Sequence, residues 1–168
     1  MIKNNLLVLS LENNLTKQTK QKLAETLDLF FVDADDILQY NMIDDDMLET
    51  CGKEYFEKEQ KKVLLGLAEY ENSLVSGRFN LFFKDDMIKN FQSKFIVIYL
   101  RVDKKLLNEY QSNKKFTVLN QSKNNLLAFD VEDKILCKNA DIVVKTTNND
   151  DENIKNFKQQ LLKFVEAK

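Results

Sequence analysis

Short apolar runs recur along the chain and alternate with stretches whose apolar residues have helical spacing. The runs at residues 5–9, 29–33, 73–76, 94–100 and 140–145 have the length and composition of buried strands. The spacing predicts long helices over residues 15–27, 53–70 and 153–167, shorter helices over 36–40, 47–50, 85–91 and 103–110, and a partly helical segment over 126–137. Strands that alternate with helices predict an α/β fold, with a parallel sheet covered on both faces and ligands at the carboxyl ends of its strands.

Polar residues between these elements predict the caps and loops. Asp35 or Asp36 is expected to cap the helix that ends at Tyr40, and the acidic residues 44–46 suit the positive end of the next helix. Residues 111–125 are polar and rich in lysine, which predicts a mobile, lid-like loop. Without repeats or a linker, residues 1–168 are expected to form a single domain.

Composition narrows the class of protein. The chain has 43% hydrophobic and 31% charged residues, and its net charge of −2 comes from interspersed charges, so neither nucleic acid nor a membrane is an expected partner. Histidine is absent, and the two cysteines, Cys51 and Cys137, are too few for a disulfide framework and are expected to be small buried residues. No apolar run approaches the roughly 18 residues of a membrane span. We therefore expect a soluble, cytoplasmic protein.

The order and spacing of several short motifs resemble the shikimate kinase family. The motifs are the apolar strand at 5–9, Phe-Val-Asp-Ala-Asp at 31–35, Gly-Lys-Glu-Tyr-Phe at 52–56, the segment 71–77 that ends in glycine, and the strands at 98–100 and 140–144. The resemblance implies a three-layer α/β/α fold with a five-stranded parallel sheet of the P-loop kinase type. It also implies a transferase of aromatic amino acid biosynthesis that moves a phosphoryl group from ATP to shikimate with magnesium.

The phosphate-binding loop of the family has the form Gly-x-x-Gly-x-Gly-Lys-Ser/Thr and falls on residues 10–17. Its three glycines are replaced by Ser10, Asn13 and Leu15, its lysine by Thr16 and its hydroxyl residue by Lys17. Glycines allow backbone N–H groups to turn inward around phosphates, and a leucine is a poor substitute at such a position. The loop is therefore expected to be degenerate, with Thr16 and Lys17 as its remaining nucleotide-binding candidates.

One shift of register would partly rescue this loop. If it slips by one residue, Lys17 takes the place of the phosphate lysine, with Thr19 or Gln18 behind it. The glycines remain missing in either register, so this interpretation is the less favoured of the two.

Substrate recognition also departs from the family, which holds the shikimate carboxylate with forked arginine side chains. The chain has only two arginines, Arg78 and Arg101. The positions where the resemblance places arginines hold Glu57, then Glu132 or Lys134, and at best Lys115 in the lid. Gly77 alone survives from a glycine triplet at the substrate site. Arg78, which follows it, is either a relocated anion-binding group or a solvated turn residue.

Two aspartates of the family are kept. The resemblance places Asp33 near magnesium and Asp35 at the substrate hydroxyls, where it is the candidate general base; alternatively, Asp35 is simply a helix cap. With Lys17 at the position of the metal-binding hydroxyl, we predict a Lys17–Asp33 ion pair where magnesium would otherwise sit.

The favoured hypothesis is a shikimate kinase-like protein that has lost ATP-dependent phosphotransfer and acts as a binding or regulatory pseudokinase for a protein partner or a small ligand, without a cofactor. The alternative is an active shikimate kinase or related small-molecule phosphotransferase whose ATP site is rebuilt from Lys17, Arg78 and Lys115, with ATP and magnesium as cofactors. A third hypothesis is an oligomerisation or scaffold module that uses the exposed side of the C-terminal helix.

Overall fold

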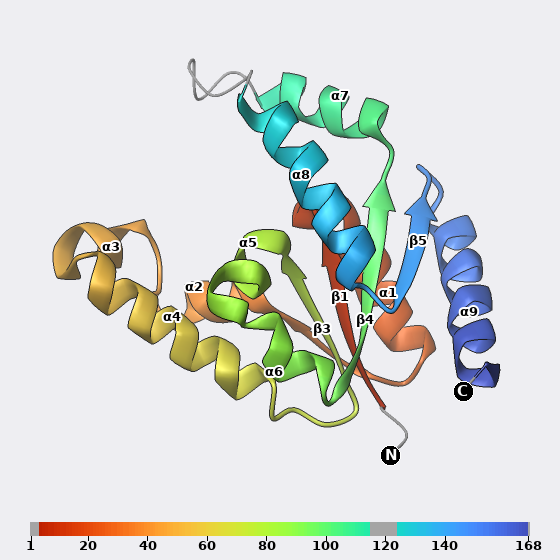
Figure 1. The fold of residues 1–168 in the computed structure, drawn as a ribbon, viewed down its shortest axis with the longest axis horizontal. Coiled ribbons are helices and arrows are strands. Elements are labelled where there is room, and N and C mark those ends of the chain that lie inside the picture. Colours follow the sequence, from red (N-terminus) through yellow and green to blue (C-terminus); the bar gives the residue numbers. More distant parts are fainter. Residues whose placement is uncertain (1–3, 115–123, 168) are drawn as a thin grey trace.

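The computed structural model describes residues 4–114 and 124–167, which form a parallel five-stranded sheet and the helices around it (Figure 1). The strands lie in the order β2-β3-β1-β4-β5. They are β1 (Asn5–Ser10), β2 (Phe30–Asp33), β3 (Ser73–Arg78), β4 (Phe95–Val102) and β5 (Ile142–Thr146). All four pairings are parallel, so the carboxyl ends of the strands meet at one edge of the sheet.

Helices cover both faces of the sheet. The side chains of β1 alternate between the faces: Leu6 and Val8 pack with α1 and α9, whereas Leu7 and Leu9 belong to the core on the opposite face. One layer consists of α1 (Asn13–Thr26) and α9 (Asp150–Glu166). The other contains α2 (Ala34–Tyr40), α4 (Lys53–Leu67), α5 (Phe79–Phe83), α6 (Ile88–Gln92), α7 (Lys104–Lys114) and α8 (Asn124–Asn139). This arrangement confirms the expected three-layer α/β/α fold.

Two short elements complete the chain. A 3₁₀ turn, η1 (Lys84–Asp86), links α5 to α6, and α3 (Asp45–Cys51) lies beside α4, away from the sheet (Figure 1). None of the seven residues of α3 is buried. No helix in the described ranges is both long and apolar enough to cross a bilayer.

Several boundaries differ from the sequence-based expectations. Helix α1 begins at Asn13, two residues earlier than expected, and β3 continues through Gly77 instead of ending there. The cap of α2 is Asp33, whose side chain accepts hydrogen bonds from the backbone N–H groups of Asp35 and Asp36. Neither of the two aspartates expected to cap this helix does so.

The predicted lid-like loop at 111–125 is helical at both of its ends, because α7 continues to Lys114 and α8 begins at Asn124. The rest of the predicted loop, residues 115–123, lies outside the part of the chain that the structure describes. Cys51, which was expected to be buried, is exposed, and Cys137 is partly buried.

Candidate functional site

Polar residues gather on one face of the sheet near the carboxyl ends of β1, β2 and β3. Ser76 lies opposite Val8 on one side and Asp33 on the other. Because side chains alternate along a strand, Ser10, Asp33 and Ser76 project from the face that α1 covers. All three are buried, so their polar groups need partners within the protein.

Helix α1 supplies those partners. Asn13, Thr16 and Lys20 follow one another at helical spacing, and each is buried. The side chain of Lys20 is completely buried, and its Nζ donates to Ser10 Oγ at 3.0 Å and to Asn13 Oδ1 at 2.7 Å. The Thr16 hydroxyl lies 2.8 Å from Ser10 Oγ. An ammonium group of the protein itself therefore lies at the amino end of α1, beneath the segment that corresponds to the phosphate loop.

Asn13 is the centre of this arrangement. Its Oδ1 accepts from Lys20 and from the Ser76 hydroxyl at 3.0 Å, and its Nδ2 donates to Asp33 Oδ2 and to Asp35 Oδ2, each at 3.0 Å. Ser76 Oγ also lies 3.0 Å from Asp33 Oδ2. We call this buried network the Lys20 cluster; it consists of Ser10, Asn13, Thr16, Lys20, Asp33 and Ser76.

Two ion pairs border the Lys20 cluster. Lys17 Nζ lies 2.6 Å from Asp36 Oδ1, and Arg78 Nε lies 3.0 Å from Asp35 Oδ1. The predicted Lys17–Asp33 ion pair is wrong in its acidic partner. The Asp33 carboxylate points inward, where it caps α2 and binds Asn13, whereas Lys17 reaches the outer face of the first turn of α2 at Asp36.

Burial and neighbouring charges shift the pKa values of these groups. Burial lowers the pKa of Lys20 to about 7, although the charges of Asp33 and Asp35 oppose the shift. Burial raises the pKa of Asp35 against the opposing charge of Arg78. Partial burial alone would lower the pKa of Lys17, but its hydrogen bond to Asp36 and the nearby carboxylates outweigh that effect and raise it. Lys17 thus stays charged at neutral pH.

The other site residues expected from the sequence do not join the Lys20 cluster. Gly77 lies in β3 against the ring of Phe82, and Lys115 lies outside the described residues. Thr19, the hydroxyl of the shifted register, donates to Asp150 Oδ1 at 2.6 Å and so ties α1 to α9. Lys20, the central cation, was missed by the sequence reasoning, although its spacing from Thr16 and Leu23 places it on the buried face of α1.

The positions expected to hold substrate arginines carry acidic groups with their own partners. Glu57 forms ion pairs with Lys84 and Lys53. On α8, Glu132 has a pKa raised by burial, and its neighbour Asp133 binds both Nε and a terminal nitrogen of Arg101, at 2.9 and 2.6 Å. The forked guanidinium of Arg101, which could bind a substrate carboxylate, is therefore already paired with the carboxylate of Asp133.

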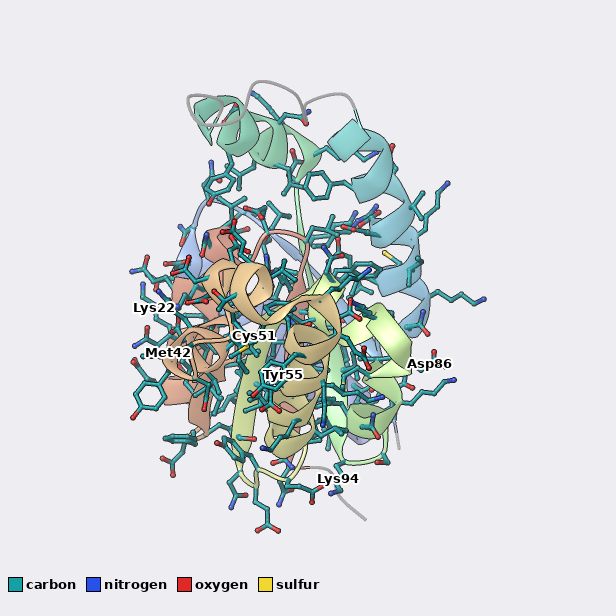
Figure 2. The ribbon with its side chains drawn as sticks, turned by 90° about the vertical axis from the view of Figure 1, so that its left-hand side faces the viewer. Lys22, Met42, Cys51, Tyr55, Asp86 and Lys94 are labelled. Carbon is teal, nitrogen blue, oxygen red and sulfur yellow. The ribbon has the colours of Figure 1, made fainter. Side chains whose placement is uncertain are left out.

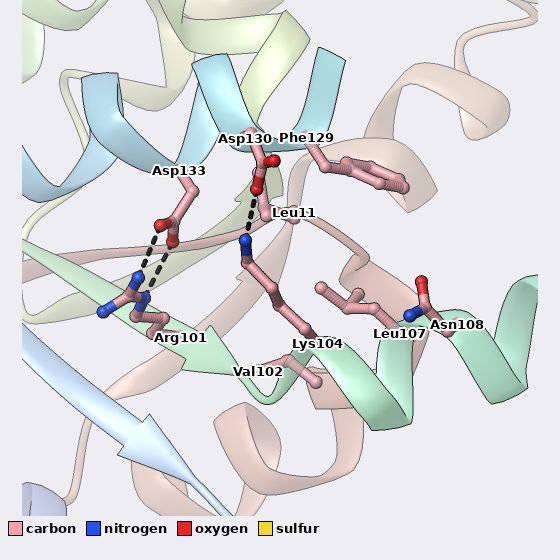
Figure 3. Close-up of a pocket in the computed structure, with 9 residues that line it drawn as sticks. All are labelled: Leu11, Arg101, Val102, Lys104, Leu107, Asn108, Phe129, Asp130 and Asp133. Atoms are coloured by element: carbon pink, nitrogen blue, oxygen red, sulfur yellow. Dashed lines mark hydrogen bonds and ion pairs between the residues drawn. The ribbon is translucent and has the colours of Figure 1, made fainter. Parts of the chain in front are cut away.

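A pocket of about 240 Å³ lies between α7, α8 and the end of β4 (Figure 3). Its charged side chains form two pairs, Arg101 with Asp133 and Lys104 with Asp130. The other lining residues are Leu11, Val102, Leu107, Asn108 and Phe129. Because the pocket is mainly apolar and its charges are paired, it suits a small uncharged or zwitterionic molecule better than a polyanion.

The Lys20 cluster does not fit magnesium and a triphosphate. Asp33 Oδ1 accepts two backbone N–H groups, and Oδ2 is bonded by Asn13 and Ser76. Among the side chains that the structure describes, no three of His, Cys, Asp or Glu group closely enough to hold a metal ion. Only Leu11 and Glu12 separate β1 from α1, which leaves little backbone to turn around a phosphate.

Comparisons with known proteins agree with this fold. A shikimate kinase from Aquifex aeolicus superimposes with a TM-score of 0.77 at 22% identity, covering 98% of this chain and 99% of that one. A shikimate kinase from Bacteroides thetaiotaomicron gives 0.75 at 14% identity, with 96% and 98% covered. An Acinetobacter baumannii shikimate kinase in complex with shikimate gives 0.72 at 18% identity, with 97% and 93% covered.

At these identities the superpositions show the fold, and no curated protein matches the chain. The sequence model described as shikimate kinase matches residues 17–164, which leaves out residues 10–16 of the segment corresponding to the phosphate loop. Since that match covers most of the 168 residues, the chain belongs to the shikimate kinase family.

Proposed function

We propose that this protein has lost ATP-dependent phosphotransfer and acts as a binding or regulatory member of its family. The observation that carries the proposal is the charge balance around the Lys20 cluster. Three basic side chains face three acidic ones there: Lys17, Lys20 and Arg78 against Asp33, Asp35 and Asp36. A triphosphate needs uncompensated positive charge, and among the described residues of this site each cation already has an acceptor.

The geometry of the amino end of α1 supports the same proposal. In a P-loop, backbone N–H groups and a lysine surround the phosphates. Here, residues 13–17 are already helical, and the buried ammonium of Lys20 is bonded to Ser10 and Asn13. Binding phosphate would require this network to open. Leaving a buried polar group without its hydrogen-bond partner costs about 1 to 3 kcal/mol, and more where the group is charged.

Isothermal titration with magnesium ATP tests the proposal directly. We expect no binding tighter than about 1 mM, whereas the Aquifex aeolicus shikimate kinase, titrated under the same conditions, serves as the positive control. Micromolar binding of ATP to this chain would contradict the proposal. Circular dichroism of the same sample shows whether the protein is folded, so that a lack of heat has a clear meaning.

The binding role has room for a small ligand. The pocket beside Arg101 and Asp133 lies next to Leu11 at the carboxyl end of β1, the edge of the sheet where ligands bind in folds of this class. Its paired charges favour a neutral or zwitterionic molecule. A screen of such compounds by thermal shift, with Phe129→Ala as the control variant, tests this site; a ligand whose shift survives in that variant binds elsewhere.

One observation favours the alternative of a phosphotransferase. Burial raises the pKa of Asp35, which suits a general base, and Arg78 lies beside it. Under this alternative, the site uses Lys17, Arg78 and Lys115 and turns over shikimate or a related polyol. A coupled assay of ADP release should then show activity that disappears in Asp35→Asn. We expect no such activity in the wild-type protein.

A further inference from the structure

Exposed apolar side chains gather around α3, at the end of the molecule away from the sheet. Tyr40 is 86% exposed, Met42 74% and Tyr55 48%. Figure 2 looks onto this face and shows Met42, Cys51 and Tyr55 on it. We call it the α3 surface; its apolar members are Tyr40, Met42, Leu48, Cys51 and Tyr55.

Helix α3 itself is short and lies at the periphery of the molecule (Figure 1). It has only seven residues, none of them buried, and it packs chiefly on α4. Helices this short are marginal in water and depend on packing for their stability. Leu48 is nevertheless 36% exposed and Cys51 is exposed, so the helix carries apolar groups that the described chain covers only in part. Such grouped apolar exposure is characteristic of interaction surfaces.

The charges around these apolar groups indicate the chemistry of the partner. Residues 40–57 contain six carboxylates and a single lysine, although the whole chain has a net charge of only −2. Glu57 is paired, as described above, and Asp44 caps α3. The remaining carboxylates form no ion pair within the described residues: Asp45, Asp46, Glu49 and Glu54. They are all exposed.

We infer that the α3 surface docks a basic amphipathic segment of a partner protein. Lysine or arginine side chains of that segment pair with the free carboxylates, while its apolar side chains cover Met42, Leu48 and Tyr55. The inference gives a partner class to the binding role proposed above and rests on that proposal for its biological meaning. The surface itself is separate from the Lys20 cluster, so the two can fail independently.

The test uses a fluorescent 18-residue model helix with leucine on one face and lysine on the other. Its binding to the full-length protein is followed by anisotropy. We expect saturable binding, and we expect no binding by a Leu/Glu helix of the same length or by a Lys/Ser peptide that lacks the apolar face. Binding of either control peptide at equal strength would overturn the inference, because recognition requires both charge and an apolar face.

Matched variants locate the binding. Met42→Ser/Tyr55→Ser removes apolar contacts, and Asp45→Asn/Asp46→Asn/Glu49→Gln removes three carboxylates. Each variant should weaken binding of the Leu/Lys helix about tenfold or more. For the carboxylate variant, the reason is that three exposed ion pairs together are worth roughly 1.4 kcal/mol. The controls are Leu162→Ser/Val165→Ser, which changes two exposed apolar residues of α9, and Glu25→Gln/Asp151→Asn/Glu166→Gln, which removes three exposed carboxylates elsewhere.

The controls should bind like the wild type. Equal losses of peptide binding in the test variants and in the control variants would show general attraction to an acidic protein and would overturn the inference. Self-association of the protein that is abolished by Met42→Ser/Tyr55→Ser would also overturn it, since the surface would then belong to a second copy of this chain. Titration of the same samples with magnesium ATP separates the two proposals. ATP binding together with peptide binding refutes only the loss of phosphotransfer, whereas a lack of both refutes only the docking surface.

Discussion

A buried lysine needs acceptors for its ammonium group, and Lys20 has two, in Ser10 and Asn13. Asn13 matters most because it also bonds Ser76, Asp33 and Asp35. An asparagine carries both a carbonyl oxygen and an NH₂ group, so it can serve a cation and a carboxylate together. At the residue scale, the segment that corresponds to the phosphate loop thus takes part in a buried network in which the polar side chains bond to one another.

Substitution of Asn13 tests how much this network contributes. Asn13→Ala leaves Lys20 with one acceptor and deprives Asp33 of a donor, so it should lower the free energy of unfolding by about 2 to 4 kcal/mol. The control is Asn14→Ala, because the Asn14 side chain is exposed and, within the described residues, donates one long hydrogen bond of 3.4 Å to Tyr110. This variant should change stability by less than about 0.5 kcal/mol. Urea denaturation measures both. Similar values for the two variants would show that the network contributes little.

Single residues were the hardest features to predict from the sequence. The sequence alone showed that the glycines of the phosphate-loop pattern are replaced. It also showed acidic residues at positions where the family resemblance places arginines. The Lys17–Asp33 pair was wrong because Asp33 caps α2 and thereby turns its carboxylate away from Lys17. Burial of Lys20 was not foreseen because a lysine on a helix normally extends its ammonium group to water. Its acceptors come from a strand end and from the first turn of its own helix.

Gly77 shows how a residue expected at the substrate site also has a role in packing two elements. It lies in β3, directly beneath the buried ring of Phe82 from α5. A Cβ atom built on Gly77 would overlap Cε2 of that ring. Gly66, in the last turn of α4, has no heavy atom within 4 Å of the corresponding position.

The same substitution at the two glycines should therefore have opposite effects. Gly77→Ala should destabilise the protein by about 1 to 3 kcal/mol through overpacking. Gly66→Ala should stabilise it by about 0.5 to 1 kcal/mol, because alanine is the better helix former. Thermal or urea denaturation compares the variants. Equal stability of Gly77→Ala and the wild type would indicate that Phe82 moves freely, and a double variant with Phe82→Leu should recover part of the loss.

Elements were predicted best where one pattern was long and unmixed. The strands at 94–100 and 140–145 and the helices over 53–70 and 153–167 were found close to their observed bounds. The five-residue helix α5 was missed, because its three phenylalanines are too few to show a period. The early start of α1 at Asn13 was missed because no sequence signal distinguished a loop from a helical turn at residues 13 and 14.

At the scale of the molecule, the order of the strands brings the Lys20 cluster together. Residues 10, 33 and 76 lie far apart in sequence and meet only because β3 lies between β1 and β2. Periodicity predicted a parallel sheet, and the P-loop kinase type of the fold came from the resemblance to a family, which the match over residues 17–164 now shows. The strand order itself was not predicted and comes from the structure. The charge balance of the site could not be read from the sequence, because it depends on which carboxylate each cation reaches.

This buried charge makes the stability of the whole fold depend on pH. Lys20 has a folded-state pKa of about 7 against an ordinary value of 10.5. Between these pH values the unfolded chain holds a proton that the folded chain has released, so the proton favours unfolding. Raising the pH through this window removes that advantage and stabilises the fold, with a slope of at most about 1.4 kcal/mol per pH unit. Below pH 7, Lys20 is protonated in both the folded and the unfolded chain, so the full cost of burying its charge remains.

Comparison with Lys20→Met isolates this effect from the other groups that titrate in the same range. The stability of the wild type relative to Lys20→Met should rise by about 1 to 3 kcal/mol between pH 7 and about pH 9.5. Lys22→Met, which removes a partly exposed lysine of the same helix, should follow the wild type. Urea midpoints across the pH range provide the measurement. If the free energies of unfolding of the wild type and Lys20→Met differ by the same amount at every pH, Asp33 keeps Lys20 charged throughout. The buried ammonium group would then not titrate in this range.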